Sequence, residues 1–94
     1  MEKESLRYEF SIEKNQKLIT ERRISFEEVI MAIEEDAVLD ILPHPNSEKY
    51  PNQEIYVLNI NNYVYLVPFI KEGRVIFLKT IFPHRKLTQQ YLRR

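Results

Sequence analysis

The spacing of hydrophobic and polar positions changes at the midpoint of the chain. Up to about Asp40, charged residues surround apolar positions that recur at helical spacing. From Glu54 to Phe82, aliphatic, aromatic and β-branched residues dominate, which is typical of strands. The pattern therefore predicts helices in the first half of the chain and an antiparallel sheet in the second.

Two helices are predicted after a short extended segment at residues 7–10. Ser11 is the expected N-cap of the first helix, whose apolar stripe is weak. The second helix, over residues 25–35, is clearer because Ser25 and Glu28 have the spacing of a capping box. Its apolar side chains recur at i, i+3, i+4 and i+7, which is one face of a helix: Phe26, Val29, Ile30 and Ile33.

A β-hairpin is predicted from strands 55–60 and 63–70. The two asparagines at 61–62 tolerate the positive φ angles of a type I′ turn, which places Ile60 opposite Tyr63. One face of the hairpin is then aliphatic: Ile55, Val57, Val64 and Leu66. The other face bears the tyrosines: Tyr56, Leu58, Ile60, Tyr63, Tyr65, Val67 and Phe69. We expect the aliphatic face to pack under the helices. The tyrosine-bearing face is then either a binding surface or is covered by the first helix or the C-terminal segment.

The rest of the chain completes the predicted fold. Its expected elements are a strand at 38–42, a proline-rich loop at 43–52, a turn at 71–74 with Gly73 in a bulge position, a last strand at 75–82 ended by Pro83 and a helical turn at 86–92. The length of the loop is typical of a functional or partner-dependent element. The fold class is therefore α+β: two N-terminal helices packed on an antiparallel sheet of about four strands, with a short C-terminal helix. We expect a single domain over residues 1–94.

Composition narrows the classes of function. Lys+Arg and Asp+Glu both number 14, so a nucleic-acid site must be a local basic patch. The chain has no cysteine, 2 histidines and 1 glycine, too few for a thiolate or histidine-built metal site or a glycine-rich phosphate loop. It contains no run of about eighteen apolar residues, and its charged start lacks the apolar region of a signal peptide. We therefore expect a cytoplasmic domain with no cofactor and no membrane contact.

Sequence blocks near both ends of the chain resemble one family. Phe10 and Lys14 match the first and last positions of a Trp-Asp-x-x-Lys helix start. Residues 24–29, Ile-Ser-Phe-Glu-Glu-Val, match a Val-Ser-Phe-Glu-Glu-Ala block at the same separation. Residues 83–88, Pro-His-Arg-Lys-Leu-Thr, then Tyr91, match a Ser-Ala-Arg-Lys-Ala-Thr block followed by a tyrosine. These blocks and the order of elements are similar to those of the BrnT-family toxins, a branch of the RelE-like superfamily.

The resemblance leaves out the middle loop, and two positions depart from it. Ser11 replaces the family's aspartate, and Arg22-Arg23 replace its His-Gly, so any role of that histidine is not carried over. What the resemblance implies is a type II toxin: a ribonuclease that cleaves RNA without a metal ion and thereby inhibits translation and growth. It also implies a cognate antitoxin, expected to be a ribbon-helix-helix protein that represses the operon and through which any oligomer would form.

Metal-free RNA cleavage needs a base for the 2′-OH, positive charge at the phosphorane and an acid for the leaving 5′ oxygen. His84 is the candidate acid or base because histidine usually does this work near neutral pH. Arg85 and Lys86 follow it as candidate phosphate-binding cations. Lys79 is a further candidate whose face depends on a bulge at Gly73. The alternative is a solvated charge pair beside an exposed loop histidine.

RNA contacts are predicted around this catalytic cluster. The candidate RNA-binding residues are Lys14, Arg22, Arg23, Lys79, Tyr63 and Tyr65. Ordinary helix-surface charges and cross-strand packing of the tyrosines explain the same residues without RNA. His44, which lies between two prolines, is interpreted as a rigid loop residue rather than a catalytic one.

A rival hypothesis is a non-catalytic protein-binding module that uses the same small α+β fold. The zero net charge favours this hypothesis, because a ribonuclease usually benefits from a basic surface. The family-like blocks at the two ends favour the toxin.

Overall fold

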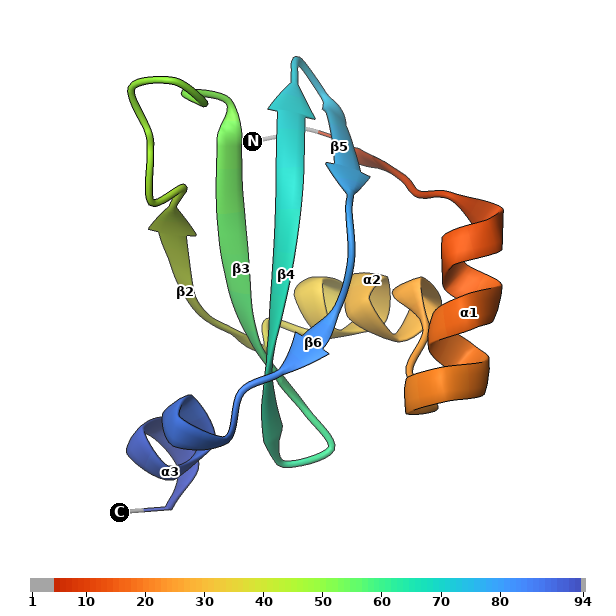
Figure 1. The fold of residues 1–94 in the computed structure, drawn as a ribbon, viewed down its shortest axis with the longest axis vertical. Coiled ribbons are helices and arrows are strands. Elements are labelled where there is room, and N and C mark those ends of the chain that lie inside the picture. The colour runs from red at the N-terminus through yellow and green to blue at the C-terminus, as the bar shows by residue number, and fades with distance from the viewer. Residues whose placement is uncertain (1–4, 94) are drawn as a thin grey trace.

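The computed structural model describes residues 5–93 as three helices and six strands (Figure 1). In chain order these are β1 (Arg7–Glu9), α1 (Ile12–Arg22), α2 (Phe26–Glu34), β2 (Val38–Pro43), β3 (Gln53–Ile60), β4 (Tyr63–Glu72), β5 (Val75–Leu78), β6 (Phe82–Pro83) and α3 (Arg85–Leu92). Within the described part of the chain, no helix is both long and apolar enough to cross a membrane.

The sheet is mixed and has six strands, in the order β1-β5-β4-β3-β2, with β6 also paired to β4. Strand β1 runs parallel to β5, and the other pairs are antiparallel. The predicted α+β class is confirmed, but the prediction of about four antiparallel strands is wrong. The prediction treated β1 only as an extended segment and not as a strand of the sheet. It also treated β5 and β6 as one continuous strand.

The β3–β4 hairpin has the predicted turn and register. Asn61 and Asn62 adopt φ angles of 54° and 64°, and Ile60 pairs with Tyr63. At the other turn, Gly73 also has a positive φ, 61°, but Glu72 pairs with Val75 without a bulge. The predicted bulge at Gly73 is therefore wrong. A positive φ at the first of two central residues is typical of a type II′ turn, for which glycine is the natural residue.

The irregularity lies instead between β5 and β6. Leu78 pairs with Phe69, and Phe82 pairs with Leu66, so this side of the ladder holds one residue more than β4. This extra residue is a β-bulge, and it returns the fully buried Ile81 to the helix-covered face of the sheet.

Helices α1 and α2 form where their capping residues predict. The Ser11 hydroxyl accepts a hydrogen bond from the Lys14 backbone N–H, and the Ser25–Glu28 capping box is complete. Asn15 joins the two helices: its amide oxygen accepts from the Phe26 backbone N–H at 2.8 Å, and its amide nitrogen donates to Glu27 at 2.9 Å. A buried asparagine is thus satisfied while it fixes the start of α2.

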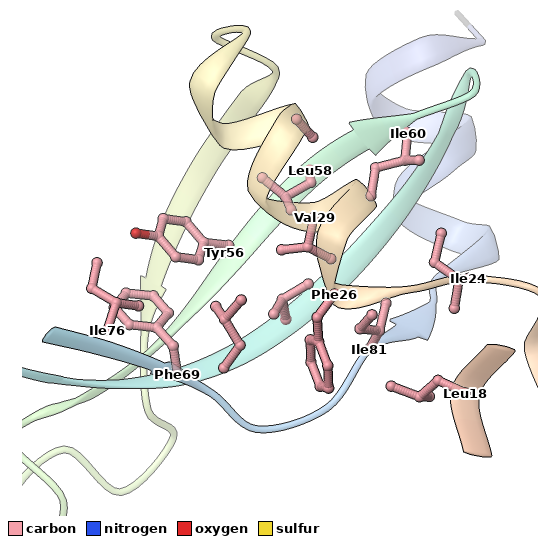
Figure 2. Close-up of a cluster of buried hydrophobic side chains, with 13 residues drawn as sticks. Leu18, Ile24, Phe26, Val29, Tyr56, Leu58, Ile60, Phe69, Ile76 and Ile81 are labelled. Carbon is pink, nitrogen blue, oxygen red and sulfur yellow. The ribbon is translucent and has the colours of Figure 1, made fainter. Parts of the chain in front are cut away.

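The helices cover the tyrosine-bearing face of the sheet, so the prediction that they pack on the aliphatic face is wrong. Phe26 and Val29 of α2 meet Tyr56, Leu58 and neighbouring side chains of this face in one buried cluster (Figure 2). The Tyr56 and Phe69 rings stack with centroids 4.1 Å apart. The larger side chains lie on this face, and burying them removes more apolar area from water. The face is therefore covered rather than free for binding, but mainly by the second helix, with Leu18 of α1 at the edge of the cluster, and not by the first helix alone or the C-terminal segment.

Helix α3 covers one end of the opposite face. Val57 and Val64 lie on that face, outside the main cluster, and both are fully buried. The buried Thr88 hydroxyl accepts from the Val64 backbone N–H at 2.9 Å and donates to the His84 carbonyl oxygen at 2.8 Å. These two bonds attach the first turn of α3 to β4. Figure 1 shows α3 near the β3–β4 turn, well away from the other end of the sheet.

Candidate functional site

The predicted catalytic histidine lies where β6 passes into α3. The His84 backbone N–H donates to the Val64 carbonyl at 2.9 Å, which continues the sheet to the helix start. Its imidazole Nδ1 accepts from the Leu87 backbone N–H at 3.1 Å, so His84 is the N-cap of α3. The side chain is half-buried. His84 is therefore held by the backbone at both ends and is not an exposed loop residue.

The cap bond decides which nitrogen of His84 is available. Nδ1 accepts a hydrogen bond, so in the neutral ring the proton sits on Nε2. Nε2 makes no hydrogen bond to any of residues 5–93. In this arrangement the ring can donate a hydrogen bond from Nε2 without disturbing the helix. To act as a general acid or as a base at Nε2, the ring must carry a proton on Nδ1, which breaks the cap.

Arg85 and Lys86 form the first turn of α3, and both are exposed. This turn contains no acidic residue. Free backbone N–H groups and the helix dipole make a helix N-terminus attractive to anions and unfavourable for cations. Two cations at this position therefore raise the local positive potential, and an anion bound beside them would relieve it. The expected phosphate-binding pair does lie next to His84.

Tyr63 and Tyr65 lie at the same end of the sheet. Tyr65 pairs with Pro83, one residue before His84, and the two tyrosine rings meet edge to face with centroids 5.8 Å apart. Both side chains are half-buried. Burial, with a smaller contribution from the Glu28 carboxylate, raises the pKa of Tyr65 above its ordinary value. Its hydroxyl is therefore a neutral hydrogen-bond donor at physiological pH.

Arg22 reaches this end of the sheet from α1. Its guanidinium donates from Nη1 to the Ile81 carbonyl at 2.6 Å, just before β6. Nη1 of the Arg22 guanidinium is therefore already bonded to the backbone of the bulged segment before β6. Arg23 ends α1 in the left-handed conformation, with φ 55°, and its side chain is exposed.

Two predicted RNA-binding cations lie elsewhere. Lys79 approaches Gln53, with Nζ 3.4 Å from Oε1, on the sheet face opposite the helices. Lys14 lies in the first turn of α1, about 12 Å along the helix from Arg22 at the usual rise per residue. The structure thus places His84, Arg85 and Lys86 side by side at the start of α3. Tyr63 and Tyr65 lie at the same end of the sheet but on its helix-covered face, and Lys14 and Lys79 lie elsewhere.

His44 has a structural place in the proline-rich loop. Its ring packs on Tyr50 with centroids 4.6 Å apart, and its Nδ1 accepts from the Asn46 backbone N–H at 2.9 Å. Its backbone N–H donates to the Gln53 carbonyl, which closes the loop. These contacts fit the interpretation of His44 as a rigid loop residue.

Sequence reasoning missed Thr88, the residue that positions His84. It lies four residues after the histidine, the distance at which a helical hydroxyl can bond back to a carbonyl, and this spacing was the only available signal. The described residues hold no group of three or more acidic or histidine side chains arranged to bind a metal ion.

The comparisons with known proteins identify no relative. Protein-family models, curated proteins and solved structures were each searched, and none matched this chain.

Proposed function

We propose that the chain is the toxin of a type II toxin–antitoxin pair, a metal-independent endoribonuclease that acts in the cytoplasm and inhibits translation. The observation that supports the proposal is the adjacency of His84, Arg85 and Lys86 at the start of α3, at the end of the sheet that also carries Tyr63 and Tyr65. A cognate antitoxin, expected to be a ribbon-helix-helix protein, would neutralise it. The sequence blocks shared with BrnT-family toxins include this same segment.

The geometry suggests a role for each group. Arg85 and Lys86 hold the scissile phosphate at the N-terminus of α3, and they stabilise the charge that builds up on the phosphorane. The 2′-OH attacks phosphorus and its proton passes to water. His84 acts as the imidazolium, protonated on both ring nitrogens and released from its cap, and donates its Nε2 proton to the 5′ oxygen as the P–O bond breaks, so the ring becomes neutral and the products are a 2′,3′-cyclic phosphate and a 5′-hydroxyl. The tyrosines offer surfaces on which bases can stack.

The test uses purified protein with single-stranded RNA, first alone and then with ribosomes, in the presence of EDTA. His84→Asn keeps an N-cap acceptor but removes the acid, and it should lower cleavage about 10²–10⁴-fold. Arg85→Ala should cost at least as much. Lys79→Ala is the matched cation control, because Lys79 reaches Gln53 at the end of β3 far from the β3–β4 turn, and it should leave cleavage unchanged.

Two results would count against the proposal. Full activity in both His84→Asn and Arg85→Ala would place the site elsewhere. Absence of cleavage by the wild type under either condition, with no growth arrest on expression, would favour the second candidate function, a non-catalytic protein-binding module. The observation that favours this second function is Phe77, which keeps 38% of its surface exposed on the sheet face that α1 and α2 do not cover.

A further inference from the structure

A hollow lies between α2 and the turn that joins β3 to β4, and we call it the α2 hollow. Its volume is about 180 Å³, which is room for about six waters or for one long side chain. The apolar residues that line it are Met31, Ala32, Ala37 and Ile60. The two alanine side chains are too short to fill the space between helix and strand. The hollow therefore results from the packing of α2 on the sheet.

The rim of the α2 hollow carries two carboxylates. Glu28 and Glu35 both line it, and they lie about two helical turns apart, or about 10 Å. The Glu28 carboxylate is partly engaged, since its Oε2 accepts from the Ser25 backbone N–H at 3.1 Å. Glu35 is exposed, and its carboxylate makes no hydrogen bond or ion pair with any of residues 5–93. Glu35 is therefore the acceptor that a ligand in the hollow can use.

The end of α2 is electrostatically unfavourable. Glu34, Glu35 and Asp36 follow one another there, and the last turn holds no basic residue. The carbonyl groups at a helix C-terminus carry partial negative charge, so carboxylates at this position destabilise the helix and a bound cation relieves them. The α2 hollow includes Glu35 at this same end. The helix terminus thus favours a positively charged ligand for a reason that is independent of the cavity.

No cation among residues 5–93 pairs with the two carboxylates of the rim. Residues 24–48 contain seven acidic residues and no Lys or Arg. Arg93 lies beside the β3–β4 turn, but its guanidinium is directed to the Asn62 carbonyl at 3.4 Å. The negative charge of this side of the molecule repels the phosphates of RNA. The ligand is therefore expected to be a cation other than one of these side chains, and not a nucleic acid.

Shape and charge together select one kind of ligand. The apolar wall favours a hydrocarbon stem, and the carboxylate beside it favours a cationic head. Arginine combines the two, because its planar and weakly hydrated guanidinium can bind a carboxylate through two parallel N–H donors. A free amino acid would bring its own carboxylate close to Glu28 and Glu35, which like charge disfavours. Met31, 56% exposed at the hollow, offers apolar area to the residues that flank an arginine within a protein chain.

We propose that the α2 hollow is a docking site for an arginine side chain of a partner protein. The stem of this arginine lies against Ala32, Ala37 and Ile60, and its guanidinium binds the Glu35 carboxylate. A neighbouring apolar residue of the partner rests on Met31. The site does not depend on the proposed ribonuclease activity, since the hollow shares no residue with the start of α3.

The test uses N-acetyl-arginine N-methylamide, which presents the side chain as it occurs within a protein chain. The matched probe is its citrulline analogue, which has nearly the same shape and no charge. Amide chemical-shift changes in the labelled wild-type protein locate the site and give the dissociation constant. The arginine probe should bind with a dissociation constant of about 1–10 mM, about fivefold or more tighter than the citrulline probe. Shifts are expected at Met31, Ala32, Ala37 and Asn61, and not in α3.

Variants of the protein identify the carboxylate. Glu35→Gln removes the charge and keeps the size of the side chain, so it should abolish the preference for the arginine probe. It should leave the melting temperature unchanged or raise it, since the carboxylate was unfavourable at the helix end. Glu48→Gln is the matched control, an exposed glutamate in the loop at the opposite end of β3, and it should keep the full preference. RNA cleavage should be unaffected by either change, so the docking site and the ribonuclease can fail independently.

Several outcomes would overturn the proposal. They are the absence of shifts at the α2 hollow with the arginine probe, equal binding of the two probes, or equal loss of preference in Glu48→Gln. Tighter binding of free arginine than of the blocked probe would also overturn it, because the occupant would then be an amino acid. Concentration-dependent self-association that Glu35→Gln abolishes would do the same, because the occupant would then belong to a second copy of this chain.

Discussion

Both faces of the sheet carry apolar side chains, but the two faces differ in how they are closed. On the helix-covered face, Phe69 is 2% exposed and stacks on Tyr56, beneath α2. On the opposite face, Phe77 lies on the adjacent strand and is 38% exposed. The difference comes from the covering elements: two helices on one face, and a helix of 8 residues on the other. Hydrophobicity of a strand therefore does not tell which of its faces is closed.

The same substitution on the two faces gives the largest expected contrast. Phe69→Ala should lower the free energy of unfolding by about 3–5 kcal/mol, because it leaves a cavity in the closed core. Phe77→Ala should cost about 1 kcal/mol or less, since much of that ring is already in water. Urea unfolding of the two variants measures both values. Equal losses would mean that the opposite face is as closed as the core.

The link between α3 and β4 should account for the next largest effect. Thr88→Val removes the acceptor of the Val64 backbone N–H and leaves this donor buried and unpaired, at a cost of about 1–3 kcal/mol. Thr88→Ser keeps the hydroxyl and is the control. Amide exchange at Val64 should accelerate in the valine variant only. Unchanged exchange would show that α3 stays attached through its apolar contacts alone.

The closed face also depends on the correct start of α2. Ser25→Ala removes one half of the capping box and should cost about 1 kcal/mol. Ser47→Ala, in the exposed loop, should change stability by less than about 0.5 kcal/mol. Thermal melts of both variants give the comparison. If Ser25→Ala behaves like Ser47→Ala, the Asn15 bond to the Phe26 backbone N–H is sufficient to start the helix.

The smallest expected effect is a pH dependence that belongs to the closed face. Burial raises the pKa of Tyr56 from 10.0 to about 12, so the folded protein holds this proton more tightly than the unfolded chain. This difference in proton affinity adds to the free energy of unfolding below pH 10, and the added stability is lost as the pH rises through 12. Tyr56→Phe should flatten this alkaline loss while changing stability near neutral pH only slightly. Identical alkaline profiles for both proteins would mean that the phenol is solvated.

Local interactions made several features of the fold predictable from the sequence. The Ser25–Glu28 box and the two asparagines at 61–62 act within a few residues, so residue type alone fixed the start of α2 and the register of β3 with β4. The adjacency of His84, Arg85 and Lys86 was equally visible, because neighbours in the chain at a helix start stay neighbours in space. The capping role of His84 was not predicted, since it depends on where α3 begins.

Only the tertiary structure decided which face of the sheet is closed. Both faces of β3 and β4 satisfy the period of a half-buried strand, and the choice depends on where α1 and α2 pack. The bulge before β6 turns the Ile81 side chain into the core. The backbone carbonyl of Ile81 accepts a hydrogen bond from Arg22, which lies 59 positions earlier in the chain. The sequence by itself determined the elements, their caps and the tight turns, because these depend on contacts between near neighbours. The closed face, the parallel strand β1 and the bond from Arg22 to the Ile81 carbonyl depend on contacts between residues far apart in the sequence, which no local pattern predicts.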